Sequence, residues 1–145
     1  MNTQELAEAV AEAMFAADRA SQKLGMRIVA VRPGYAQLKM TVQPDMLNGH
    51  AMCHGGFIFC LADSAFAFAC NTHNQTTVAA GCTIDYLAPA HKGDELTAEA
   101  VEQAVLGRTG VYDVAVSNQK GERIAIFRGR SHRIKGEVIP GAGSA

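Results

Sequence analysis

One acidic residue stands alone in the most apolar stretch of the chain. Between residues 55 and 71, Asp63 is the only charged side chain, and the seven residues on either side of it include no Lys, Arg or His. A buried carboxylate without a partner is costly and usually finds one or shifts its pKa. Asp63 is therefore a candidate catalytic carboxylate. The structural alternative is a helix cap or a salt bridge to a residue distant in sequence.

Two glycines and three polar side chains lie at or before the start of this stretch. Gly55 and Gly56 would leave backbone N–H groups open at the start of a helix, where the helix dipole favours an oxygen that gains negative charge. The alternative is that the glycines only permit close packing. Asn48 could position water or a carbonyl group, and His54 could orient a substrate or cap the helix. His50 is a weaker candidate than His54 for a role in the site.

The remaining histidines and the cysteines do not indicate a metal site. His73 and His91 resemble surface histidines, and no Asp, His or Cys follows a coherent metal-ligand spacing. We expect buried free thiols, because no C-x-x-C pair is present. The four cysteines are Cys53, Cys60, Cys70 and Cys82.

Length and charge narrow the class of protein. The 145 residues suit one domain, which we expect over residues 1–138, with a flexible tail at 139–145. Thirteen Lys and Arg against fourteen Asp and Glu disfavour a nucleic-acid binder. Residues 1–10 lack the basic region of a signal peptide, and no apolar run reaches the roughly 18 residues of a membrane span. We expect a cytoplasmic protein that binds neither nucleic acid nor a membrane.

The hydrophobic periodicity predicts an α+β fold. An antiparallel sheet of hairpin-linked strands would curl around one long central helix that is apolar on every side. One sheet covers one side of such a helix, so a second copy of the chain is the natural cover for the rest. The expected helices span residues 3–22 and 54–71, and the expected strands span 26–32, 35–42, 76–87, 95–105, 109–117 and 122–135.

The spacing along the central helix also indicates a second copy. Asp63 follows Gly55 by eight residues, which is about 12 Å of helix, so one helix cannot easily aim both groups at one carbonyl. Two antiparallel copies related by a dimer axis can do so, with Gly55 of one subunit facing Asp63 of the other. This arrangement would give two sites per dimer.

Four strings of residues resemble those of hot-dog-fold thioesterases of the phenylacetate-degradation type. The resemblance covers nearly the whole chain and implies hydrolysis of aryl- or arylacetyl-coenzyme A (CoA) thioesters without a metal or organic cofactor. It also implies a dimer of dimers with sites at the dimer interfaces. The strings are Asn48–Phe57 with Asp63 seven residues past Gly56, Cys82–Pro89, Gly110–Asp113 and Ile126–Ile134.

The same resemblance implies roles for individual residues. Asp63 would be the nucleophile or general base, the Gly55 N–H would polarise the thioester, and Gly56 would lie beside the substrate. Asn48 and His54 would be supporting groups. Some relatives carry a Ser or Thr after the helix to orient water, but residues 78–81 contain no hydroxyl group.

Coenzyme A carries phosphates, so cationic residues are expected near the mouth of the site. By resemblance, we favour Arg108 and Arg133 for this role. The alternative for any single arginine is a solvated surface charge.

Two other functions remain open. A hot-dog enoyl-CoA hydratase would carry Asp and His five residues apart, as Asp45 and His50 are, but the expected Asn-Pro between them is replaced by Leu47-Asn48. A non-enzymatic acyl-CoA-binding module would normally add a DNA-binding segment, which the short, non-basic N-terminal helix does not resemble.

Overall fold

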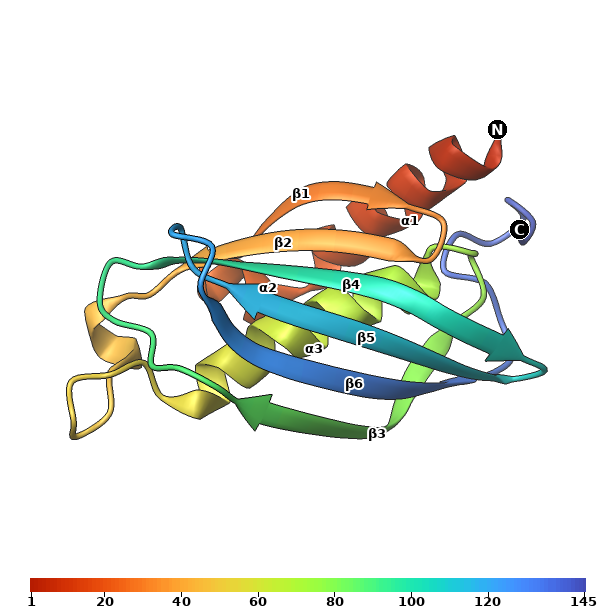
Figure 1. Cartoon of the computed structure of the whole chain (residues 1–145). Coiled ribbons are helices and arrows are strands. Elements are labelled where there is room, and N and C mark those ends of the chain that lie inside the picture. Colours follow the sequence, from red (N-terminus) through yellow and green to blue (C-terminus); the bar gives the residue numbers. More distant parts are fainter.

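A six-stranded antiparallel sheet curves around one central helix in the computed structural model, which describes all 145 residues (Figure 1). The strand order is β1-β2-β4-β5-β6-β3. The helices are α1 (Thr3–Ala17), α2 (Arg19–Lys23) and α3 (Gly55–Asn71). The strands are β1 (Arg27–Arg32), β2 (Tyr35–Thr41), β3 (Thr77–Tyr86), β4 (Glu95–Leu106), β5 (Thr109–Ser117) and β6 (Arg123–Arg133).

The central helix α3 forms because an apolar run is bounded by glycines and a polar loop on one side and by polar residues on the other. Its buried side chains, such as Leu61 and Phe66, pack under β2, β4 and β5. The inward-facing residues of the strands, such as Leu38 and Phe127, complete the core. This is the α+β hot-dog fold expected from the sequence, and the strand boundaries agree to within two residues.

The N-terminal helix differs from the expected single helix over residues 3–22. Asp18 interrupts it, since its backbone N–H bonds to the carbonyl oxygen of Phe15 and its carboxylate accepts the N–H of Ser21. Asp18 thus ends α1 and caps α2. The Oγ of Ser21 lies 2.8 Å from the Oγ of Ser64, so the break joins this segment to α3 beside Asp63.

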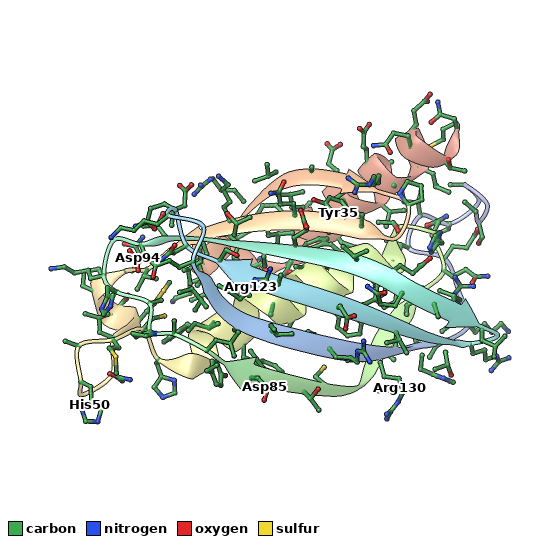
Figure 2. All side chains as sticks on the ribbon, viewed as in Figure 1. Tyr35, His50, Asp85, Asp94, Arg123 and Arg130 are labelled. Carbon is green, nitrogen blue, oxygen red and sulfur yellow. The ribbon has the colours of Figure 1, made fainter.

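The loop before α3 is folded back on itself. It contains a short 3₁₀ helix (Pro44–Met46) and one isolated β-bridge between Leu47 and Cys53. The backbone N–H of His54 donates to the carbonyl oxygen of Met46 at 2.8 Å. These bonds hold the loop beside the first turn of α3, and the tip of the loop carries His50 away from the body of the protein (Figure 2).

Strand β3 forms one edge of the sheet, and it pairs only with β6 (Figure 1). Next to it, α3 is not fully covered within the protomer, because Cys60 is exposed and Asp63 is only half-buried.

The C-terminal residues lie against the turn after α3. The side chain of Asn74 is fully buried and donates to the carbonyl oxygens of Ile139 and Gly143, and it accepts the N–H of Ile139. The N–H of Ala145 donates to the carbonyl oxygen of His73. No helix of the protein is both long and apolar enough to cross a membrane.

Candidate active site

The first turn of α3 presents one free backbone donor. The imidazole Nδ1 of His54 caps the helix by accepting the N–H of Gly56 at 3.0 Å, and the carbonyl oxygen of His54 accepts the N–H of Phe57 at 3.0 Å. The N–H of Gly55 makes no hydrogen bond within the protomer. At the positive end of a long helix, this group is suited to bind a carbonyl oxygen that gains negative charge.

Asn48, on the loop before α3, supplies a second donor. Its side-chain oxygen accepts the N–H groups of His50 at 2.9 Å and Met52 at 3.2 Å, which fixes the amide plane. Its Nδ2 amide group has no partner in the chain and remains available for a ligand.

Asn48 and Gly55 line the same groove, which we name the Gly55 groove and which has a volume of about 440 Å³. Its other walls are mainly apolar and come from the loop, from the first turns of α3 and from the corner after β3. The combination of two polar donors and apolar walls is typical of a site that orients one polar group of a largely apolar ligand. The other lining residues are Met52, Cys53, Ile58, Tyr86, Leu87, Ala88 and Pro89.

Tyr86 is a member of this groove that the sequence reasoning missed. Its hydroxyl group donates to the carbonyl oxygen of Gly55 at 2.9 Å. A Cβ atom on Gly55 would lie 3.0 Å from the ring carbon Cζ of Tyr86, which is too close for ordinary packing. The close approach of Tyr86 therefore gives a steric reason for glycine at position 55. Tyr86 lies within a string that carried the resemblance, but no spacing signal connects it with Gly55.

Asp63 has no partner in the protomer. Its carboxylate accepts no hydrogen bond and lies within ion-pair distance of no cation, so it is neither a helix cap nor half of a salt bridge. Burial raises the pKa of Asp63 above its ordinary value, and the negative charge of Asp18 raises it further. An unpaired, partly desolvated carboxylate of this kind is suited to act as a base or nucleophile.

The protomer brings Asn48 and Gly55 together in the Gly55 groove, but it leaves Asp63 outside. His54 precedes Gly55 as the cap of α3 and does not line the groove. Gly56 also lies outside the groove, and its N–H is taken up by the bond to His54. Asp63 lies eight residues farther along α3, about 12 Å away by helix geometry.

Arg108 and Arg133 meet at the opposite end of the molecule. They line a cavity of about 580 Å³ together with Lys135, and we name it the arginine cavity. The backbone N–H of Arg133 donates to the carbonyl oxygen of Arg108 at 2.7 Å, and neither side chain makes a salt bridge. The cavity adjoins the C-terminal end of α3 through Gln75, whereas Gly55 lies at the N-terminal end.

The other candidate residues have simpler surroundings. Asp45 and His50 are exposed on the loop. The prediction that His73 is a surface histidine is wrong, because its ring is largely buried and bonds to Glu102 at 2.8 Å. No cluster of three or more His, Cys, Asp or Glu side chains has metal-binding geometry.

All four cysteines are free, but they differ in exposure. Burial raises the pKa of Cys53 to about 11 and that of Cys70 to about 12. Cys60 is exposed, contrary to the expectation of burial, because it lies on the uncovered face of α3.

Comparison with known proteins places this geometry in a family. Residues 50–125 match the thioesterase superfamily. The acyl-coenzyme A thioesterase PaaI of Escherichia coli strain K12 is 48% identical over 128 residues, covering 88% of this chain and 91% of that protein. The solved structure of the E. coli PaaI protein from the phenylacetic acid degradation operon superposes with a TM-score of 0.92 at 46% identity, covering 94% of this chain and 99% of that one.

A second solved structure, of the TT0310 protein from Thermus thermophilus, has a TM-score of 0.78 at 39% identity and covers 81% of this chain and 98% of that chain. The matched segment contains the free Gly55 donor and the unpaired Asp63 carboxylate. This chain belongs to the thioesterase superfamily.

Proposed function

We propose that this protein hydrolyses acyl-CoA thioesters to the free acid and coenzyme A, with phenylacetyl-CoA or ring-hydroxylated phenylacetyl-CoA as substrate. The observation that carries the proposal is the pair of unused donors, the Gly55 N–H and the Asn48 amide, at the head of an apolar groove. Similarity to the E. coli thioesterase of the phenylacetic acid degradation operon supports this choice of acyl group.

In this proposal the thioester carbonyl binds at the start of α3. The Gly55 N–H donates to its oxygen, and the Asn48 amide is the second donor. Both stabilise the oxyanion that forms when the carbonyl carbon becomes tetrahedral. His54 supports them by capping Gly56, which fixes the first turn.

Asp63 supplies the basic group. As a general base it takes a proton from water, the hydroxide adds to the acyl carbon, and the C–S bond breaks as coenzyme A leaves as the thiol with that proton. As a nucleophile it attacks the acyl carbon, the C–S bond breaks, and coenzyme A leaves as the thiolate, which gives an acyl–Asp63 anhydride. Water then hydrolyses the anhydride to the free acid and the Asp63 carboxylate, and the proton released from that water is taken up by the thiolate. Both routes need an ionised Asp63.

The proposal includes a dimer, because Asp63 and the Gly55 groove of one protomer lie on different turns of α3. An antiparallel partner that covers the face carrying Cys60 and Asp63 would place its own Asp63 beside Gly55. Two such dimers would form the tetramer expected from the sequence. Four free cysteines support a reducing, cytoplasmic environment.

Arg108 and Arg133 are proposed to hold the phosphates of coenzyme A. Their side chains are free of salt bridges, and they converge on one polar cavity. The C-terminal end of α3 lies about 12 Å beyond Asp63 by helix geometry. The subunit that contributes Asp63 would therefore also contribute the phosphate contacts.

Thiol release is the direct test. We expect coenzyme A to be released from phenylacetyl-CoA and hydroxylated phenylacetyl-CoA faster than from acetyl-CoA. Release from none of the three would contradict the proposed hydrolysis, and equal rates would contradict only the acyl preference. A change in enoyl absorbance with an enoyl-CoA and no thiol release would favour the hydratase instead.

A further inference from the structure

We infer that Tyr86 is a positioning and specificity-determining residue of this site. It contacts Gly55 in two ways, through the hydrogen bond from its hydroxyl group to the Gly55 carbonyl oxygen and through its ring, which occupies the space beside the Gly55 Cα atom. The inference rests on the proposed function, because it assigns Tyr86 to the groove in which the thioester would bind.

Gly55 needs an external contact to keep its donor in place. It is the first residue of α3, where the backbone N–H groups lack helical partners and helix ends fray. Glycine has no side chain with which to anchor itself. His54 holds the next residue, Gly56, through its imidazole ring, and Tyr86 holds Gly55 from the side of the sheet. A displaced donor would lose much of its effect, since catalysis depends on alignment.

Tyr86 is itself fixed by the sheet. It is the last residue of β3 and pairs with Ala125 of β6. Leu87 and Ala88 form the corner after β3. Their N–H groups both donate to the carbonyl oxygen of Ile124, at 2.8 and 3.3 Å, and these bonds fix the corner. The hydroxyl group of Tyr86 is therefore delivered to α3 from a rigid element.

The ring of Tyr86 is also available to a ligand. The residue is 50% exposed in the protomer and lines the Gly55 groove beside Leu87 and Pro89, with Ile58 of α3 also in the lining. An aromatic wall attracts a planar ring beyond the effect of area burial, by stacking or edge contacts. A straight alkyl chain gains only the free energy of burying its apolar surface. Tyr86 would thus favour an aryl-bearing acyl group over an aliphatic one.

Two substitutions separate the two roles. Tyr86→Phe keeps the ring and removes the bond to Gly55, and we expect kcat to fall by about two- to tenfold for every acyl group, with the acyl preference kept. Tyr86→Leu also removes the ring, and we expect it to lower the ratio of kcat/KM for phenylacetyl-CoA over butyryl-CoA by about two- to tenfold relative to the wild-type protein and to Tyr86→Phe. The matched control is Tyr35→Phe, which removes a hydroxyl bonded to Glu99 on β4, outside the groove (Figure 2).

The outcomes are distinguishable. If the wild-type protein releases no thiol from any of these thioesters, the proposed function is wrong and this inference is wrong with it. If the wild-type protein is active and both Tyr86 variants match Tyr35→Phe in kcat and in acyl preference, only the inference is wrong. Circular dichroism and the thermal midpoint check folding. Should Tyr86→Leu fail to fold, Tyr86→Phe decides the positioning role, and Tyr86→Met, which also lacks an aromatic ring, decides the specificity role by the same ratio.

Discussion

The imidazole Nδ1 of His54 lies 3.0 Å from the backbone nitrogen of Gly56 and accepts its N–H. A ring nitrogen can accept this bond only while it carries no proton, so the cap requires His54 to be unprotonated at Nδ1. The same bond occupies the N–H of Gly56, so the N–H of Gly55 is the free donor of the first turn.

We predict that His54→Ala lowers both stability and turnover, whereas His54→Asn keeps most of each. Loss of a helix cap costs on the order of 1 kcal/mol, and an asparagine oxygen can replace the imidazole as acceptor. The thermal midpoint and kcat would be measured for both variants. Equal loss of kcat in both, with the midpoint of His54→Asn retained, would mean that the ring itself acts on the substrate.

Asp63→Asn should separate catalysis from structure. The amide keeps the shape of the side chain and removes its charge, so we predict a fall in kcat of about 100-fold or more. The thermal midpoint should be kept or raised, because the partly buried carboxylate has no partner within the protomer. A folded, tetrameric variant with near wild-type turnover would contradict the assignment of Asp63 as the catalytic carboxylate.

The raised pKa of Asp63 predicts the pH dependence. Since the reaction needs the ionised carboxylate, activity should fall on the acid side at a higher pH than for an ordinary aspartate. Stability depends on pH in the opposite direction from activity. Because the pKa of Asp63 is raised in the folded state, its contribution to the free energy of unfolding is fully present below the unfolded-state pKa. This contribution is lost as the pH rises through the folded-state pKa. Asp63→Asn, which cannot ionise, should remove this fall in stability with rising pH.

A variant of Asp18 tests the same pH–activity profile, because the charge of Asp18 acts on Asp63. We predict that Asp18→Asn moves the acid limb of kcat/KM to lower pH, because it removes the negative charge that raises the pKa of Asp63. Glu12→Gln is the matched control, since it removes one charge from an exposed position on α1. The other titratable groups that interact with Asp63 are thiols, namely Cys60, Cys70 and Cys82, and they remain in both variants. An identical acid limb in the Asp18 variant and the control would exclude this electrostatic effect.

Arg108 and Arg133 can be tested with a substrate that lacks phosphates. We predict that Arg108→Ala and Arg133→Ala raise KM for phenylacetyl-CoA by about tenfold, because charge-assisted bonds to phosphate are lost. The phenylacetyl thioester of N-acetylcysteamine should be hydrolysed with unchanged KM. Arg123→Ala, at the start of β6 and outside the arginine cavity, is the control (Figure 2). A similar rise in KM for both thioesters would place the two arginines outside phosphate binding.

The sequence predicted most of the fold because its elements carry strong local signals. The alternation in Tyr35–Thr41 predicts a half-buried strand, and the apolar run from Gly55 to Asn71 predicts a central helix that is buried on most of its surface. The break at Asp18 was missed because it depends on side-chain bonds to Ser21, which compete with an otherwise continuous helical pattern.

The site was predicted less completely, for a different reason. Asn48, Gly55 and Asp63 differ from their apolar or irregular surroundings, so residue type alone identifies them. Tyr86 contacts Gly55 across 31 residues of chain, and only the pairing of β3 with β6 beside α3 brings them together. Such contacts between elements leave no periodic trace in the sequence.

The shared site predicts that two inactive variants will restore each other. Gly55→Ala damages the groove and Asp63→Asn removes the carboxylate, so each homodimer should be inactive. In a hybrid dimer, however, one site combines the intact Gly55 of one subunit with the intact Asp63 of the other. Random mixing makes half of the dimers hybrids with one good site of two, so we expect roughly a quarter of wild-type activity. The subunits would be coexpressed with two affinity tags, and native mass spectrometry would verify the hybrids. Verified hybrids without recovered thiol release would show that each protomer uses its own Gly55 and Asp63, and the dimeric site would be wrong.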